Sequence, residues 1–104
     1  MRLAVPAESS PHETRVSLPP DGVAAFVKDG WDVAVQAGAG VRAGFGDDLY
    51  QKAGAALAPD VAATFQQAEV VCMIGPPSPE YVSRMSPGTL LFSLLCLLYT
   101  SDAA

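Results

Sequence analysis

A polar segment near the start of the chain carries the side chains best suited to chemistry. Glu8, His12, Glu13 and Arg15 lie within the stretch VPAESSPHETRVSLPP, between an apolar run and a double proline. In α/β proteins, the loop that follows a strand commonly holds ligands and reacting groups. A guanidinium can bind a carboxylate through two parallel hydrogen bonds, and a histidine can exchange a proton near neutral pH. This loop is therefore the candidate site.

Each of these side chains also has an ordinary structural explanation. His12 is a lone loop histidine, and a solvated role is the simpler interpretation. Arg15 either turns inward to hold a carboxylate or forms an ion pair with Glu8 or Glu13 that ties the loop down. Glu8 can equally pin the loop or cap a helix. The residues alone leave these alternatives open, and we assign no catalytic residue.

The elements that position this loop alternate regularly along the chain. Short apolar runs predict strands at residues 3–5, 31–36, 55–58, 70–74 and 89–93. Helix-start signals predict helices that begin at Pro19, Asp47 (as an N-cap), Pro59 and Ser78. Connections that run through helices imply a parallel sheet with helices on both faces. We therefore expect a single three-layer α/β domain with four or five parallel strands, Rossmann-like in class and flavodoxin-like in strand order.

A glycine-rich loop follows the strand predicted at 31–36. Gly38, Gly40 and Ala43 fit the G-x-G-x-x-G/A fingerprint of dinucleotide-binding turns. In that fingerprint a helix opens within the motif, whereas here the next helix signal is delayed to Asp47. A turn in which glycines adopt positive φ is the favoured interpretation. We therefore assign no cofactor-binding residue to this loop.

Composition argues against several other functions. The chain has 104 residues and a net charge of −5, and its six Lys and Arg residues are scattered, which argues against nucleic-acid binding. No cysteine and histidine cluster has metal-ligand spacing, so no metal is expected. Cys72 and Cys96 lie in apolar runs and are expected to be buried, reduced thiols. The longest apolar run, residues 90–99, is about half the length needed to cross a bilayer.

Several short motifs, taken together and in order, resemble one family. They are MRLAVP at 1–6, HETRV at 12–16, GWDVAV at 30–35, GAG at 38–40, AGA at 53–55, AEVV at 68–71 and PGT at 87–89. This combination resembles the N-terminal domain of the alanine dehydrogenase and proton-translocating NAD(P) transhydrogenase family, over nearly all of residues 1–93. The resemblance implies a substrate-side domain whose NAD-binding half lies further along a longer chain. It also implies that the Gly38 loop is not the NAD site.

Within this family, Glu-Thr-Arg-Val at 13–16 resembles the transhydrogenase α subunit. The resemblance implies hydride transfer between NADH and NADP+, coupled to proton translocation, in the full enzyme. It places Arg15 in the cleft that faces substrate or nicotinamide, with Glu8 and Glu13 as supporting residues. A lysine of the family corresponds to Met73 here, which argues against the alternative, an alanine dehydrogenase that converts alanine to pyruvate with NAD.

The resemblance also implies cofactors, partners and location. NAD(H) would bind the half absent from this chain, and NADP(H) would bind a transhydrogenase β subunit. We expect a homodimer of this domain, a separate membrane domain, and a place on the cytoplasmic side of the inner membrane. A third alternative, from a different class, is a non-catalytic α/β binding module.

The end of the chain departs from the family pattern. Residues 96–104, CLLYTSDAA, resemble a translated transposon sequencing adapter. We therefore expect the family domain to occupy residues 1–95 and residues 96–104 to be a non-native tail. We expect the chain alone neither to bind NAD(H) tightly nor to catalyse a reaction.

Overall fold

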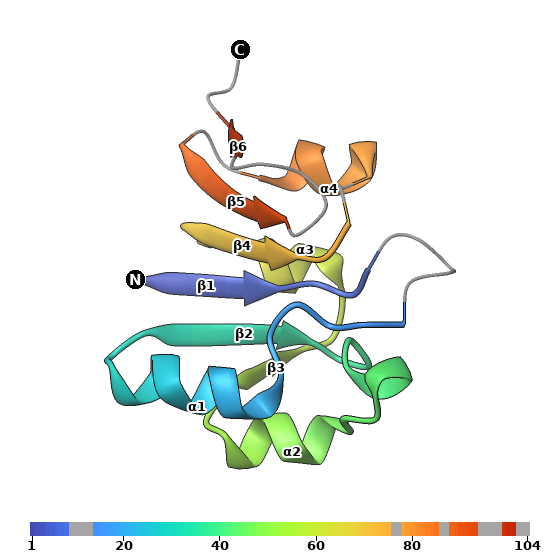
Figure 1. The fold of residues 1–104 in the computed structure, drawn as a ribbon. Helices are drawn as coiled ribbons and strands as arrows, with labels where there is room; N and C mark the ends of the chain where they lie inside the picture. Colours follow the sequence, from blue (N-terminus) through green and yellow to red (C-terminus); the bar gives the residue numbers. More distant parts are fainter. Residues whose placement is uncertain (9–13, 76–77, 86–87, 94–98, 102–104) are drawn as a thin grey trace.

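The computed structural model describes residues 1–8, 14–75, 78–85, 88–93 and 99–101 (Figure 1). Its strands are β1 (Arg2–Val5), β2 (Asp32–Gln36), β3 (Ala56–Ala58), β4 (Val70–Met73), β5 (Thr89–Ser93) and β6 (Tyr99–Ser101). Its helices are α1 (Pro20–Lys28), the 3-10 turn η1 (Val41–Ala43), α2 (Asp47–Lys52), α3 (Val61–Phe65) and α4 (Pro79–Arg84). The expected alternation of strands and helices is confirmed.

The strands form one sheet in the order β3-β2-β1-β4-β5-β6 (Figure 1). The first five strands are parallel, and β6 pairs antiparallel with β5. The predicted α/β class with a parallel sheet is confirmed. The strand order is that of the Rossmann fold and not that of flavodoxin, because Ala56–Ala58 pairs with β2 and adds an edge strand. The last strand falls within residues 96–104, for which the sequence predicts no strand.

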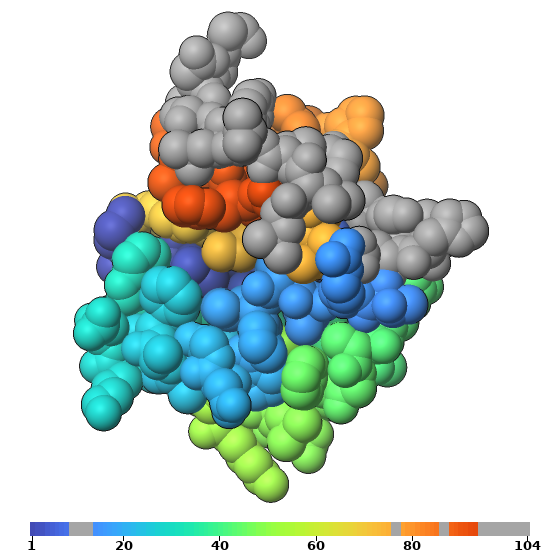
Figure 2. All heavy atoms as spheres, in the orientation of Figure 1, coloured from blue at the N-terminus to red at the C-terminus, as the bar shows by residue number. Residues whose placement is uncertain are grey.

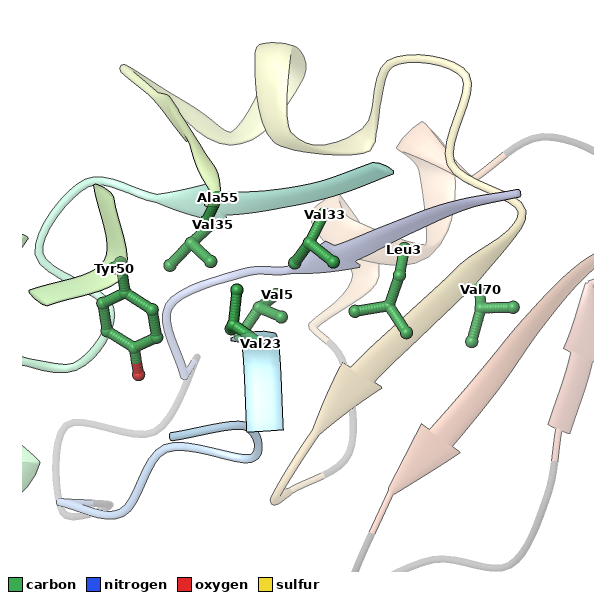
Figure 3. Packing of buried hydrophobic residues seen from close by; sticks show 8 residues of the cluster. All are labelled: Leu3, Val5, Val23, Val33, Val35, Tyr50, Ala55 and Val70. Carbon is green, nitrogen blue, oxygen red and sulfur yellow. The ribbon is translucent and has the colours of Figure 1, made fainter. Parts of the chain in front are cut away.

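Two apolar clusters lie on opposite faces of the sheet, because successive strand residues point to opposite sides. Leu3 and Val5 of β1 face the side covered by α1 and α2, where they pack with Val23 and Tyr50 (Figure 3). Ala4, between them, faces α3 and α4 and is fully buried. Both faces of β1 are therefore covered, as is usual for an interior strand of a parallel sheet.

The helix starts follow the predicted signals with one exception. Asp60 Oδ1 accepts a hydrogen bond from Ala63 N–H (2.8 Å), and Ser78 Oγ accepts one from Tyr81 N–H (3.3 Å), so both residues are N-caps. The prediction that Asp47 is an N-cap is wrong: Gly46 occupies that position and Asp47 is the first helical residue.

Gly40 packs tightly against its neighbours in the fold. A Cβ added there would lie 2.6 Å from Tyr50 Cε2 and 2.9 Å from the Phe45 carbonyl oxygen. The Tyr50 ring cannot move aside, because it is fully buried and its hydroxyl donates to Leu18 O (2.9 Å).

We therefore expect Gly40→Ala to lower the free energy of unfolding by about 2 kcal/mol, as overpacked sites do. Gly44→Ala is the control, because Gly44 has φ +90° with open space around it. Only the backbone strain of about 1 kcal/mol should appear there. Urea denaturation of both variants measures the difference, and equal costs would contradict this account of Gly40.

Candidate functional site

The candidate site lies where β1 and β4 end side by side. The chain leaves β1 toward β2 on one side and leaves β4 toward β5 on the other, so the two connections diverge at this point (Figure 1). In open α/β sheets, ligands bind in the crevice outside the carboxyl ends of such strands. The polar loop singled out in the sequence begins at this edge, directly after β1.

Glu8 joins the loop after β1 to the end of β4. Its Oε2 accepts a hydrogen bond from Ile74 N–H and its Oε1 accepts one from Gly75 N–H, both at 2.9 Å. Ile74 and Gly75 are buried and follow the last residue of β4. Hydrogen bonds to an ionised carboxylate are stronger than neutral ones. Of the two structural alternatives for Glu8, pinning the loop is therefore the one observed.

Further hydrogen bonds fix the loop on both sides of Glu8. Ala7 N–H donates to Gln36 Oε1 (2.9 Å), and Ala7 O accepts from the Tyr81 hydroxyl (2.7 Å). On the far side of the loop, the Ser17 hydroxyl donates to Cys72 O (2.8 Å). The loop is thus attached at both ends to β2, β4 and α4, so its position is set by the sheet.

Arg15 lies between these attachments, two residues before Ser17. Its side chain is exposed. Both alternatives for it, binding a carboxylate or pairing with Glu8 or Glu13, stay predictions. Its backbone lies two residues before Ser17, whose hydroxyl donates to Cys72 O of β4, so Arg15 belongs to the part of the loop that returns to the β4 end. His12 and Glu13 lie outside the described residues, so the proposed support of Arg15 by Glu13 stays a prediction.

The Met73 side chain lies in the apolar core. Its side chain is 1% exposed and packs with Phe65 and Tyr81 in the cluster under α3 and α4. Apolar packing on that face is sufficient to explain a methionine here. The lack of an amine at this position therefore says little about whether a carboxylate binds beside Arg15.

The glycine-rich loop makes contacts within the protein. Gly38, at φ +82°, donates its N–H to Asp47 Oδ1 (2.8 Å). Gly40 N–H and O lie in a tight turn in which Phe45 N–H donates to Gly40 O (2.9 Å), and Gly40 packs on Tyr50. Turn geometry and close packing thus account for both glycines and for Asp47, which supports the interpretation as a structural turn.

Burial raises the pKa of three side chains around the loop. Burial raises the pKa of the Tyr81 hydroxyl, and the negative charges of Glu80 and Glu8 raise it further. Burial also raises the pKa of Tyr50 to about 12 and that of Cys72 to about 11. All three groups are therefore neutral hydrogen-bonding or packing groups near neutral pH and not proton-transfer groups.

The raised pKa of Cys72 makes stability fall at alkaline pH. The unfolded thiol ionises near its ordinary pKa of 9.0, whereas the folded thiol keeps its proton until about pH 11. The folded state therefore binds more protons in this interval, and stability is lost as pH rises from about 9 to 11. We expect a loss of about 3 kcal/mol from this group, because one pKa unit corresponds to about 1.4 kcal/mol. Urea titrations at several pH values should show a smaller loss for Cys72→Ala, and an unchanged slope would contradict the assignment.

The described residues give no sign of a metal centre or a membrane span. Among them, no group of three or more His, Cys, Asp or Glu side chains could hold a metal ion. None of the helices in the same part of the chain is long and apolar enough to cross a membrane.

Sequence reasoning missed most of the residues that hold the loop. These contacts join residues that are distant in sequence. Gln36 Oε1 accepts from Ala7 N–H, the Tyr81 hydroxyl donates to Ala7 O, and the Ser93 hydroxyl donates to Ile74 O after β4. Tyr81 offered a partial signal, since a buried tyrosine needs a partner for its hydroxyl. The partner itself, Ala7 O, follows only from the fold.

The sheet order defines a Rossmann-like α/β domain, and the candidate site is the polar loop held at the carboxyl ends of β1 and β4. A sequence model of the family "Alanine dehydrogenase/PNT, N-terminal domain" matches residues 4–104. The chain therefore belongs to the family of alanine dehydrogenase and transhydrogenase N-terminal domains, and the resemblance inferred from the sequence is confirmed.

Individual relatives come from both branches of the family. The chain is 45% identical over 97 residues to an alanine dehydrogenase of Halomonas elongata, covering 93% of this chain and 26% of the relative. It is 33% identical over 93 residues to the NAD(P) transhydrogenase subunit alpha of Cereibacter sphaeroides, covering 89% and 18%. A solved L-alanine dehydrogenase superposes with a TM-score of 0.84 at 34% identity, covering 89% and 26%. The chain thus spans about a quarter or less of these relatives, all of which are named as oxidoreductases.

Proposed function

We propose that the complete protein transfers hydride to or from a nicotinamide cofactor and that this domain forms the substrate-side wall of its cleft. The observation that carries the proposal is the Glu8 clamp, which fixes the loop bearing Arg15 at the carboxyl ends of β1 and β4. NAD(H) would bind residues beyond this chain, because the glycine loop here is occupied by internal contacts. In this proposal the chain supplies the Arg15 cation and the sheet edge at which the loop is held.

For the particular reaction, we propose the reduction of pyruvate and ammonium to alanine by NADH. Identity of 45% to an alanine dehydrogenase supports this choice. Arg15 would hold the pyruvate carboxylate, since a guanidinium binds a carboxylate bidentately. The burial of Met73 among apolar side chains supports the proposal, because it removes the argument from the sequence against a keto acid.

Hydride transfer between NADH and NADP+ is the second candidate. The Glu-Thr-Arg-Val sequence at 13–16 and the identity to a transhydrogenase subunit alpha favour it. In that case NADP(H) would bind a β subunit, and the domain would act as a homodimer beside a proton-translocating membrane domain, on its cytoplasmic side. Arg15 would then line the cleft that faces a nicotinamide.

A rate assay on the protein expressed from the complete gene distinguishes the two reactions. We expect NADH oxidation that requires both pyruvate and ammonium. A rate that instead requires only NADP+ would support transhydrogenation, and absence of both rates in protein that binds NADH would contradict the common proposal. The 104-residue chain serves as the matched control, because we expect it to be inactive in either assay.

A further inference from the structure

The buried side chain of Tyr50 connects the glycine-rich loop to the loop that bears Arg15. A Cβ added to Gly40 would lie 2.6 Å from the Tyr50 ring, so a side chain at position 40 would displace the ring. The ring is fully buried, and its hydroxyl donates to Leu18 O (2.9 Å). Leu18 follows Arg15 by three residues. One side chain therefore joins the glycine-rich loop to the candidate site.

Residues 14–18 form the returning limb of the polar loop, and it is held on two sides. Val16 and Leu18 are partly buried against the same apolar cluster that contains Tyr50. The Ser17 hydroxyl donates to a carbonyl of β4 (2.8 Å). Figure 2 shows the blue atoms of this limb beside the green atoms of the glycine-rich loop and α2. The position of the limb thus depends on both β4 and Tyr50.

The Tyr50 hydroxyl is suited to hold this limb. Burial raises the pKa of Tyr50 to about 12, so the hydroxyl keeps its proton and donates throughout the neutral pH range. A phenylalanine ring would fill the same apolar space, so the hydroxyl is the part of the side chain that specifies contact with Leu18. A partly buried carbonyl that loses its donor is destabilised.

We propose that Tyr50, supported by Gly40, is a positioning residue that fixes the returning limb and thereby places Arg15. The glycine-rich loop, which matches a dinucleotide fingerprint in sequence, then serves the substrate side of the cleft. The effect on catalysis rests on the proposed function, in which Arg15 holds the pyruvate carboxylate. A substrate that requires an ordered limb binds more weakly in proportion to the fraction of molecules in which the limb is displaced.

Tyr50→Phe in the complete protein removes the hydroxyl and keeps the ring. We expect KM for pyruvate to rise about fivefold, as for one lost hydrogen bond, while kcat and KM for NADH stay within about twofold. Thr89→Val is the matched control, because it removes a buried hydroxyl that donates to Ala68 O (3.2 Å) at the start of β5. This control should lose a similar amount of stability and leave both KM values unchanged.

Trypsin cleavage after Arg15 provides a second readout that requires no enzymatic activity. Proteolysis of a folded protein follows the population of locally open molecules when opening is fast. Cleavage after Arg84, exposed in α4 on the opposite face of the sheet, is the internal reference for global unfolding. We expect the ratio of cleavage at Arg15 to cleavage at Arg84 to rise about fivefold in Tyr50→Phe and to stay constant in Thr89→Val.

The two readouts separate the role of Tyr50 from the reaction itself. An unchanged cleavage ratio in Tyr50→Phe, or an unchanged KM for pyruvate in that active variant, would overturn the positioning role. An equal rise of KM in Thr89→Val would also overturn it, because loss of stability would then be the cause. A complete protein without a pyruvate-dependent rate would instead overturn the proposed function, and the cleavage ratio would still decide the role of Tyr50.

Discussion

Replacing Glu8 by alanine should lower the free energy of unfolding by about 3 kcal/mol, because two buried backbone amides lose a charged acceptor. The amides belong to Ile74 and Gly75, and each lies 2.9 Å from a different oxygen of the Glu8 carboxylate. For a domain of this size, such a loss corresponds to a fall in Tm of roughly 15 °C. Thermal unfolding followed by circular dichroism measures it.

Two variants show whether the clamp is responsible. Glu8→Gln keeps one carbonyl oxygen as an acceptor and should lose about half as much stability. Glu69 is the matched control, because its Oε1 accepts the Arg2 N–H (3.1 Å) at the exposed, opposite end of the sheet. Glu69→Ala should cost less than about 1 kcal/mol. Equal costs for Glu8→Ala and Glu69→Ala would show that the Glu8 contacts contribute little.

Replacing Arg15 by alanine should reduce kcat/KM for pyruvate about a hundredfold in the complete protein. Loss of a charge-assisted, bidentate pair with a carboxylate costs roughly 1.5–3 kcal/mol, and each 1.4 kcal/mol is a factor of ten. Stability should change little, since the Arg15 side chain is exposed. Steady-state kinetics beside thermal unfolding separate the two effects.

The control for Arg15 is a cation at the opposite end of the sheet. Lys28 is exposed in the last turn of α1, and the chain leads from there into the start of β2. Lys28→Ala should leave kcat/KM unchanged within about twofold, because the charge is distant from the crevice. A similar fall for both variants would point to net charge and not to a specific contact.

Local sequence signals predicted the positions of the helices and strands well, but they did not predict the order of the strands in the sheet. Each successful signal depends only on residues that are adjacent in the sequence. Examples are Pro20 at the start of α1, the N-caps Asp60 and Ser78, and the apolar run of β4. The pairing of Ala56–Ala58 with β2 gives the sheet its Rossmann strand order. This edge strand has only three residues. Pairing of so short a strand depends on tertiary packing, which no local pattern reports.

The sequence indicated that a polar loop follows the first strand, but it did not indicate the contacts of that loop. A polar loop after an apolar strand indicated where a site would lie, and Glu8 does lie there. Its partners, Ile74 and Gly75, are 66 and 67 residues away and contribute backbone amides, which carry no signal in the sequence. The sequence likewise did not show on which face of the sheet the Met73 side chain lies, because successive side chains of a strand point to opposite faces.

The pyruvate and NADH saturation curves of the complete protein, with and without Arg15→Lys, test the central claim most directly. Lysine keeps the positive charge but cannot bind a carboxylate with two parallel hydrogen bonds. We predict that KM for pyruvate rises at least about tenfold, equivalent to one lost charge-assisted hydrogen bond, while KM for NADH stays the same. Unchanged KM for pyruvate, or an equal rise for both substrates, would contradict a substrate-side cleft built on Arg15.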